Sequence, residues 1–441
     1  MGDDGQHLFR DLLGEGEQSG PDASRGDQRG VPVQVIRPLR FPHRLGVQIG
    51  HPKISRPRRE ARSARQRHVF NLGTSTDMCR AWSTFEYTGD MGPPRFLRRA
   101  GHHAEAHVRR GIVCPNFSLH LLSGLKTMSR VLITGGNGFI GSHLAEKLEA
   151  MGDSVTLFDT RFNGNADAVH GPKVRGDIRD YSAVKEAVAG QDAVFHLAAV
   201  SRVAWGQQDP YTCWTTNLLG TLNVLEACRK SERRPALFYA SSREVYGEAQ
   251  YLPVDEDHPK MPRSIYGMTK LCAERACGSY ADPSLSPSLH PIIFRFSNVY
   301  GSERDLPERV IPKFMTKAIL GEDITLYGGE QVLDFTYIDD TISGILKAFA
   351  ASLDGGSEVP GQEFHFVTGR GVSVSELATM IVALTDSGSR IIQSPANDFE
   401  VRRFVGDPGK SHKVLGHEPR VRLEEGLKIL RERMLPIVTD A

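Results

Sequence analysis

One stretch limits the fold of this chain more than any other: "SRVLITGGNGFIGSHLAEKLEAMGDSVTLFDT". It predicts a strand over 130–134, a glycine-rich turn, a helix and a second strand over 155–159. The helix has Ile140, Leu144 and Leu148 on one face, as expected of a helix that packs on a sheet. A strand, a helix and a strand in this order form a βαβ unit, whose two strands are parallel.

Three glycines in the turn, Gly135, Gly138 and Gly141, follow the spacing G-x-x-G-x-x-G. Such a turn lets backbone N–H groups and the helix N-terminus approach a pyrophosphate, although glycines also serve ordinary turns. Asp159 ends the second strand, where a carboxylate can bind the adenosine ribose and repel a 2′-phosphate. The unit therefore indicates a dinucleotide, NAD in preference to NADP. The alternative for Asp159 is a plain turn residue.

Strands and helices continue to alternate as far as residue 300. Apolar strands separated by helices are typical of a parallel sheet covered on both faces. We therefore expect an α/β fold with a doubly wound parallel Rossmann sheet, which binds its ligands at the carboxyl ends of the strands. The segments are "VRGD" (174–177), "AVFHLAA" (193–199), the helix "TNLLGTLNVLEACRK", "PALFYASS" (235–242), a helix around 264–281 and "PIIFRFSNVY" (291–300).

Ser242 ends one of those strands, and "SIYGMTK" then places Tyr266 and Lys270 on one face of the next helix. A phenol has an ordinary pKa near ~10, but a neighbouring ammonium and a cationic nicotinamide both favour the phenolate. Tyr266 can then take a proton from a sugar hydroxyl while hydride leaves the same carbon. We expect Ser242, Tyr266 and Lys270 to be catalytic; a lone Tyr-x-x-x-Lys would be an exposed helix face.

At this point the sequence resembles the extended short-chain dehydrogenase/reductase family, specifically its nucleotide-sugar epimerases and dehydratases, of the UDP-glucose 4-epimerase kind. The resemblance covers about residues 130–432 and implies an enzyme with NAD as cofactor, a nucleotide-diphosphate sugar as substrate, and a homodimer built by helix packing. The segments that carry it, in the family's order, are "TGGNGFIG", "GDI", "HLAA", "NLLGT", "SSREVYG", "YGMTK", "RFSNVYG" and "DFTYIDD".

The resemblance also implies roles for single residues. Asn217 would support the active-site helix and Asn298 would meet the sugar diphosphate; the alternative for each is ordinary helix or turn hydrogen bonding. Asp177 and Ile178 would flank the adenine. The residues expected to contact the cofactor are Gly135, Gly138, Phe139, Ile140, Gly141, Asp159, Asp177, Ile178, Leu197, Ala198, Ala199, Tyr266 and Lys270.

Beyond residue 301 the alternation weakens, which suggests a smaller, interleaved C-terminal substrate lobe. We expect an NAD-binding Rossmann domain over 128–300 and the substrate lobe over 301–436. The segment 334–350 is expected to pack back on the Rossmann domain.

An arginine that binds diphosphate commonly precedes "DF" in the family, but this chain has Leu333 there. Arg402 and Arg403, in "EVRRFVGD", match another family arginine position. We expect them to bind the substrate phosphates, since guanidinium suits bidentate contacts to phosphate. The alternative is a solvated surface pair.

Arg243 and Glu244 directly follow Ser242. Family 4,6-dehydratases often place Asp and then Glu here, because expelling the 6-hydroxyl needs an acid and removing the C5 proton needs a base. Arginine does not give up its proton, whereas Glu244 is able to act as a base. A 4-epimerase needs neither residue, so a 4-epimerase is favoured. The alternatives are a decarboxylase or 4,6-dehydratase that uses Glu244 as a catalytic residue, and a non-catalytic NAD-binding regulator; the two side chains also suit plain charge pairing.

Residues 1–127 differ in composition from the rest of the chain. They contain 20 Lys and Arg against 12 Asp and Glu and show no sustained hydrophobic periodicity. We expect a disordered basic extension, with the functional protein starting at or near Met128. A nucleic-acid-binding arm is the alternative, but no aromatic residues interleave with the charges.

The six cysteines have neither disulfide nor metal-ligand spacing, and no apolar run spans a membrane, so we expect no metal and a cytoplasmic protein.

Overall fold

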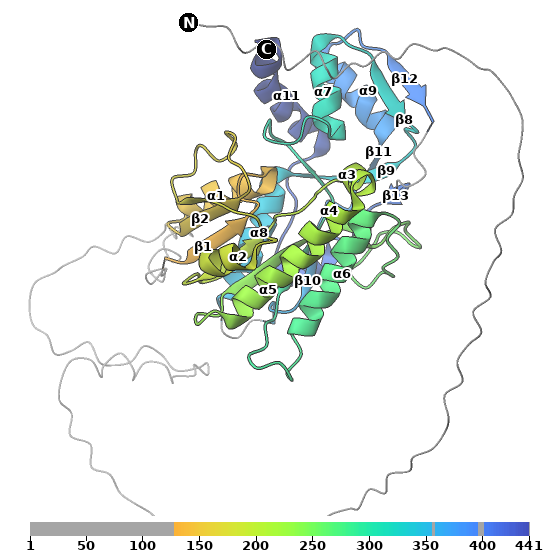
Figure 1. The fold of residues 1–441 in the computed structure, drawn as a ribbon. Coiled ribbons are helices and arrows are strands. Elements are labelled where there is room, and N and C mark those ends of the chain that lie inside the picture. The colour runs from red at the N-terminus through yellow and green to blue at the C-terminus, as the bar shows by residue number, and fades with distance from the viewer. Residues whose placement is uncertain (1–127, 355–357, 396–400, 441) are drawn as a thin grey trace, which may run out of the picture. The chain divides into compact units, whose positions relative to one another are not determined.

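The computed structural model describes residues 128–354, 358–395 and 401–440. The expectations for 1–127 lie outside the described residues. In the described part the chain forms a large parallel sheet, helices on both of its faces, and a second group of elements that holds α7, α9 and α11 (Figure 1).

The large sheet has seven parallel strands in the order β10-β6-β5-β4-β1-β2-β3. The order reverses at β1, which lies between β2 and β4, and ligands of doubly wound sheets bind at such a reversal. The predicted fold class is confirmed. The strands are β1 (Arg130–Thr134), β2 (Ser154–Asp159), β3 (Lys173–Arg175), β4 (Ala193–His196), β5 (Ala236–Ser242), β6 (Ile292–Phe296) and β10 (Glu363–Phe366).

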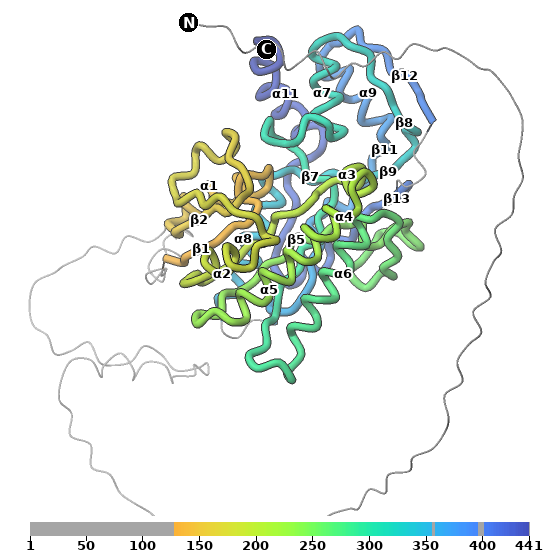
Figure 2. The backbone as a smooth tube through the Cα atoms, viewed as in Figure 1, coloured from red at the N-terminus to blue at the C-terminus, as the bar shows by residue number. Residues whose placement is uncertain are grey.

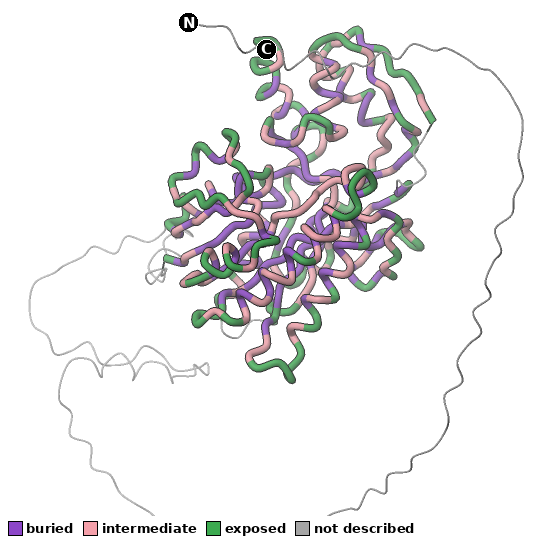
Figure 3. Tube along the Cα trace, viewed as in Figure 1, coloured by how far each residue is buried: buried purple, intermediate pink, exposed green. Residues whose placement is uncertain are grey.

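Both faces of this sheet are buried, and alternate side chains of β1 enter different cores. Val131 and Ile133 pack into one core and Leu132 into the other. Because successive side chains of a strand point to opposite faces, a continuous apolar run is what a doubly covered strand requires. Figure 3 shows the buried positions concentrated through the sheet. Helices α1 (Phe139–Ala150) and α8 (Ile338–Ser352) cover one face, and α2 (Tyr181–Val188), α5 (Gly220–Lys230) and α6 (Ile265–Tyr280) cover the other.

Two predicted elements are divided in the structure. The predicted strand 291–300 is two strands, because after β6 the chain leaves the large sheet and β7 (Asn298–Tyr300) pairs with β9 (Val332–Tyr337) instead. The Ser297 hydroxyl donates to the Asp334 carbonyl at 2.6 Å at this departure. The predicted helix "TNLLGTLNVLEACRK" begins with a π-helical turn, Thr215–Leu219, before α5.

The C-terminal part is interleaved with the sheet domain. From β7 the chain can be followed into α7 (Val310–Leu320) in Figure 2. It later returns as α8, which contacts α1, and again as β10, which pairs with β6. The sequence indicated only the first return. The other elements here are β8 (Ile324–Tyr327), β11 (Gly371–Ser373), α9 (Val374–Thr385), β12 (Ile391–Ser394), β13 (Arg403–Phe404), α10 (Gly409–Leu415) and α11 (Leu423–Thr439).

Within the described ranges, no helix is long and apolar enough to cross a membrane. Among the same residues, no group of three or more His, Cys, Asp or Glu side chains is placed to hold a metal ion.

Candidate active site

A cavity of about 970 Å³ lies at the carboxyl ends of the parallel strands, the edge where the sequence predicts ligand binding. Its walls come from the turn after β1, from the ends of β2, β4 and β5, and from α6 and α7. The fold thus brings most of the predicted site residues to one place. Those that line the cavity are Gly135, Gly138, Phe139, Ile140, Gly141, Asp159, Asp177, Ile178, Leu197, Ala198, Ala199, Ser242, Glu244, Tyr266, Lys270 and Asn298.

The glycine turn fits the pyrophosphate of a dinucleotide. Gly135 has φ +70°, a left-handed conformation that favours glycine. At Gly141 an added Cβ would lie 2.3 Å from the Gly135 carbonyl oxygen, so only glycine lets the turn close this tightly. The turn leads into the N-terminus of α1, whose unpaired N–H groups and positive dipole end attract an anion.

Two carboxylates line the cavity, one at the end of β2 and one just after β3. Asp159 accepts the backbone N–H of Asn137 at 3.0 Å, which ties the end of β2 to the glycine turn. Asp177 pairs with Arg179 at 2.5 Å, and the hydrogen bond from Arg179 lowers the pKa of the Asp177 carboxyl. Ile178, beside it, is buried. These groups have the chemistry that the ribose and adenine of NAD require, and their roles toward NAD stay a prediction.

Helix α6 places Tyr266 and Lys270 one turn apart, both buried. The helix begins at Ser264, whose hydroxyl accepts the N–H of Gly267 at 3.0 Å. Lys270 donates from Nζ to the carbonyl oxygen of Ala240 at 2.7 Å, which ties the helix to β5 two residues before Ser242. Lys270 Nζ lies 6.0 Å from the centroid of the Tyr266 ring.

Burial changes the acidity of both groups. It raises the pKa of Tyr266 to about 12 and lowers the pKa of Lys270 to about 8. A hydrogen bond with Ser242 and the charge of Arg309 counteract the rise at Tyr266. The sequence interpretation expected Lys270 to be the charge partner of Tyr266; the positive charge of Arg309 also acts on this phenol.

Asn217 fixes the position of α6. Its side-chain amide donates to the Val200 carbonyl at 3.1 Å and to the Thr269 hydroxyl at 3.0 Å, and its oxygen accepts the Val200 N–H at 2.8 Å. Thr269 precedes Lys270 on α6, so Asn217 links the loop after β4 to the turn of the helix that carries Tyr266 and Lys270. This geometry agrees with the supporting role that the resemblance implied.

A buried polar network lies beneath the same turn, and the sequence interpretation missed it. Glu274 on α6 pairs with Arg295 of β6 at 3.0 Å and accepts the Ser241 hydroxyl at 2.5 Å. Arg295 also donates to the Tyr246 hydroxyl at 2.8 Å. The strand register places Ser241 opposite Arg295, so the network joins β5, β6 and α6 next to Ser242. Before the fold is known, the only signal is a charged residue within the apolar run "PIIFRF".

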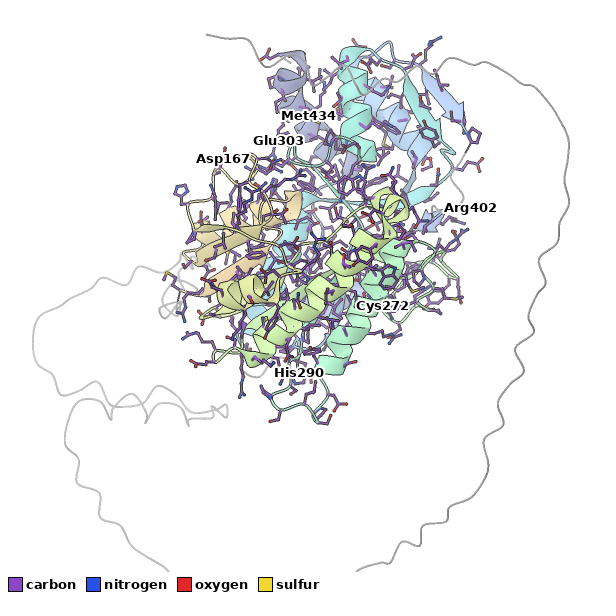
Figure 4. All side chains as sticks on the ribbon, viewed as in Figure 1. Asp167, Cys272, His290, Glu303, Arg402 and Met434 are labelled. Carbon is purple, nitrogen blue, oxygen red and sulfur yellow. The ribbon has the colours of Figure 1, made fainter. Side chains whose placement is uncertain are left out.

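The structure does not bring Arg402 and Arg403 into the cavity. Both are exposed, and neither lines it. The backbone N–H of Arg402 donates to Glu248 at 3.0 Å, and Figure 4 shows Arg402 on the right-hand side of the described part of the chain. Leu333 does line the cavity, at the place where the family commonly has an arginine.

Other cations line the cavity. Arg202, Arg304, Arg309 and Lys313 all line the cavity, and the sequence interpretation named none of them. Arg309 pairs with Asp305 at 3.3 Å, and burial raises the pKa of Asp305 to about 6. The charge-dense segment "SERDLPERVIPKF" was the available signal, but charge runs usually lie on solvated faces.

Arg243 and Glu244 form the 3₁₀ turn that follows β5, capped by Ser242, and both line the cavity. Arg243 Nη2 lies 3.0 Å from Glu244 Oε1, and both side chains are largely buried. The Arg243 guanidinium also lies over the ring of Phe404, 5.6 Å from its centroid. The charge pairing considered from the sequence is therefore present, but inside the cavity wall.

Hydride transfer to a nicotinamide needs a dinucleotide cradle and a proton-transferring side chain in one enclosure, and this cavity provides both. The fold and site thus define a nicotinamide-dependent enzyme of the Rossmann class. Residues 131–359 match the NAD dependent epimerase/dehydratase family, and the chain belongs to that family. The resemblance seen in the sequence is confirmed, and NAD is the cofactor.

Relatives of this chain include more than one activity. A UDP-N-acetyl-alpha-D-glucosaminuronate decarboxylase of Bacillus cytotoxicus is 33% identical over 68% of this chain and 95% of its own. A UDP-glucose 4-epimerase of Thermotoga maritima, solved with UDP-glucose, is 29% identical with a TM-score of 0.64, over 70% of this chain and 99% of its own. MoeE5, solved with UDP-glucuronic acid and NAD, is 31% identical with a TM-score of 0.63, over the same shares. The family is one of NAD-dependent epimerases, decarboxylases and dehydratases of nucleotide sugars.

Proposed function

We propose that this protein is an NAD-dependent nucleotide-sugar 4-epimerase, an isomerase. The observation that carries the proposal is the pairing of Arg243 with Glu244 beside Ser242. Dehydration needs an acid at this point of the site, and a guanidinium does not donate its proton. Oxidation at C4 and return of the hydride need only the cofactor together with Ser242, Tyr266 and Lys270.

The residues divide the work as follows. The Tyr266 oxygen takes the proton of the C4 hydroxyl as the 4-keto sugar forms. It gives the proton back after the 4-keto sugar has rotated in the site. Ser242 shares its hydrogen bond with Tyr266 and the C4 oxygen, and Lys270 contributes a buried positive charge. The glycine turn at Gly135 and the carboxylate of Asp159 would hold NAD, which would supply the acceptor and donor of the C4 hydride.

Arg309 acts together with Ser242, Tyr266 and Lys270 in this proposal. Burial raises the pKa of Tyr266 to about 12, which disfavours the phenolate at neutral pH, and the positive charge of Arg309 counteracts that rise. Since Arg309 lies on the side of the cavity formed by the C-terminal part, a substrate bound there lies between it and the nucleotide cradle. We infer that Arg202, Arg309 and Lys313 replace Arg402 and Arg403 as partners of the substrate diphosphate.

The nucleotide in this proposal is UDP, because the Thermotoga maritima epimerase and MoeE5 were solved with UDP-sugars. The homodimer and the cytoplasmic location expected from the sequence remain part of the proposal. Light scattering of the purified protein tests the dimer: a monomer mass at working concentration contradicts it.

One observation favours a second candidate. Glu244 is 7% exposed and lines the cavity, two residues after Ser242. A carboxylate in that place is positioned to act as a base, and the Bacillus cytotoxicus relative is a decarboxylase. A decarboxylase, or a 4,6-dehydratase, that uses Glu244 is therefore the alternative.

Product analysis in D₂O separates these reactions. The full chain is incubated with UDP-glucose and, separately, with UDP-glucuronic acid, and the products are identified by mass and NMR. We expect a product with the substrate's mass and no deuterium on C5, because 4-epimerisation never breaks the C5–H bond. Decarboxylation loses CO₂ and dehydration loses water, and each leaves solvent deuterium on C5.

A variant at Glu244 completes the test. Glu244→Gln is expected to retain at least a tenth of the activity, well above the 10²- to 10⁴-fold loss typical of removing a catalytic acid or base. A loss of mass with deuterium at C5, together with an inactive Glu244→Gln variant, would make Glu244 the base and would rule out the 4-epimerase. No turnover of any nucleotide sugar would leave the non-catalytic NAD-binding regulator.

A further inference from the structure

Arg243 has a buried donor that the protein itself does not use. Its side chain is only 12% exposed, and Nη2 lies near Glu244. Nη1 is buried and has no hydrogen-bond partner among the described residues. A buried, charged N–H donor without a partner is strongly unfavourable, so such a group in a cavity wall indicates a ligand that supplies an acceptor.

The position of Arg243 determines which part of a ligand it meets. The preceding residue, Ser242, shares a hydrogen bond with Tyr266, the group that handles the C4 oxygen in the proposed reaction. Arg243, Ser242 and Tyr266 line the same cavity, so the proposed reaction places Arg243 in the part of the cavity that holds the sugar. Asp159 and Asp177, which suit the ribose and adenine, lie at the other end, beyond the glycine turn.

The contacts of Arg243 hold its guanidinium in place. The stacking on Phe404 and the ion pair with Glu244 come from two segments of the chain, one after β5 and one in β13. A guanidinium held on two sides loses little conformational freedom when it binds a ligand, which favours a geometrically specific contact. A guanidinium fixed in this way is suited to recognise one part of a bound ligand.

We propose that Arg243 is a specificity-determining residue that binds a carboxylate on C5 of the sugar, so that the preferred substrate is a nucleotide uronic acid. The inference rests on the proposed function, because it takes C4 to lie at Ser242 and Tyr266. Substituents on the ring carbon next to C4 are then within reach of the next residue along the chain.

The charges of the cavity favour an anionic sugar. Among the described residues that line it, eight side chains are cationic and five are carboxylates. One of those carboxylates, Glu244, already offsets Arg243, and Lys270 adds a positive charge to the same cavity wall. A carboxylate accepts from Nη1 through a hydrogen bond in which both partners are charged, whereas a 6-hydroxyl offers only a neutral acceptor.

Binding, measured apart from turnover, tests the inference. In the full chain carrying Tyr266→Phe, with NAD present, the Kd values of UDP-glucuronic acid and UDP-glucose are measured by titration calorimetry. We expect at least a tenfold preference for UDP-glucuronic acid. Arg243→Met, added to this chain, is expected to reduce the preference by about 10- to 100-fold, as for the loss of a hydrogen bond to a charged group. The ratio of the two Kd values does not depend on the fraction of protein that is folded.

Two further variants sharpen the result. Arg233→Met makes the same change at an exposed arginine that pairs with Asp192, and it is expected to leave the preference unchanged. Arg243→Lys retains the charge but loses the planar fork, so part of the preference should remain. It also serves if the methionine variant does not fold.

Two outcomes overturn the inference: a Tyr266→Phe chain with Arg243 intact that binds UDP-glucose as tightly as UDP-glucuronic acid, or an added Arg243→Met change that weakens the binding of both sugars equally. The proposed reaction fails in a different way. If the binding preference is present but no product with inverted C4 is formed, Arg243 recognises the carboxylate and the chemistry is not epimerisation.

Discussion

Tyr266 lies in an environment that opposes its own ionisation. Burial raises the pKa of its phenol to about 12, while the hydrogen bond with Ser242 and the charge of Arg309 act in the other direction. Lys270, with its pKa lowered to about 8, holds its proton at neutral pH and donates to the Ala240 carbonyl. The pKa of Tyr266 therefore depends on its burial and on the groups around the phenol.

Removing the phenolic oxygen tests the role of Tyr266 directly. We expect Tyr266→Phe to retain bound NAD but to lower turnover by about 10²-fold or more, the effect of losing a general base. The measurements are the NAD content of the purified protein and the initial rate. Tyr211→Phe is the matched control, since Tyr211 is 78% exposed and should tolerate the change. Near-normal turnover of Tyr266→Phe would remove Tyr266 from its role.

At the scale of elements, α1 and α6 each position a different part of the site. The N-terminus of α1 holds the glycine turn, and α6 brings Tyr266 and Lys270 against the end of β5. The Glu274–Arg295 pair fixes α6 on the sheet one turn beyond Lys270. Both helices act through their attachment to strand ends, so their registers set the geometry of the cavity.

A single methyl group at Gly141 is expected to damage the cradle. In Gly141→Ala the new Cβ would lie 2.3 Å from the Gly135 carbonyl, so the turn must open and NAD binding should weaken by at least tenfold. Gly278→Ala in α6 is the control, because nothing lies within 4 Å of its added Cβ. It should keep the NAD affinity and raise the free energy of unfolding by up to about 1 kcal/mol. Equal NAD affinities in the two variants would contradict this account.

His196 at the end of β4 predicts a dependence on pH. It lies between the hydroxyls of Thr134, at 2.7 Å, and Thr221, at 3.0 Å, and burial lowers its pKa from 6.5 to about 3. The unfolded chain binds a proton there below pH 6.5, whereas the folded chain does not until about pH 3. The stability that neutral His196 contributes is therefore present above pH 6.5 and lost as the pH falls.

The His196→Asn variant isolates this contribution. The difference in the free energy of unfolding between wild type and variant should shrink by about 2 kcal/mol between pH 7 and pH 5, because other titrating groups cancel in the comparison. Urea unfolding at the two pH values measures it. A difference that stays constant would mean that His196 is protonated in the folded protein.

At the scale of the molecule, the cavity belongs to two interleaved parts. The nucleotide cradle comes from the first half of the sheet, while Arg309 and Lys313 come from the segment that follows β7. The chain then returns to the sheet through α8 and β10. This interleaving ties the side of the cavity that carries Arg309 and Lys313 to the same sheet that carries the glycine turn.

Deleting residues 1–127 tests where the function lies. The seven-stranded sheet and all residues named for the cavity are within 128–440. We therefore expect the shortened chain to match the full chain in thermal unfolding midpoint, NAD content and turnover. A loss in any of these would assign residues 1–127 a part in the fold or the reaction.

The sequence by itself determined the βαβ cradle, the alternation of strands and helices, and the spacing of Tyr266 and Lys270. Each of these depends on interactions within a few residues of each other: side-chain periodicity, the conformational needs of a glycine turn, and one helical turn between two side chains. Such patterns keep their meaning in any fold that contains them. For this reason the fold class, the NAD cofactor and the family could be predicted from the sequence.

Only the tertiary structure decided which charges meet in the cavity. Arg309 enters it while Arg402 and Arg403 do not, and Arg243 stacks on Phe404, which lies 161 positions further along the chain. The return of β10 to the sheet was also not predicted, because its short apolar run can pair with any strand edge. Contacts between such distant segments depend on how the whole core packs, since no local pattern records which surfaces will face each other.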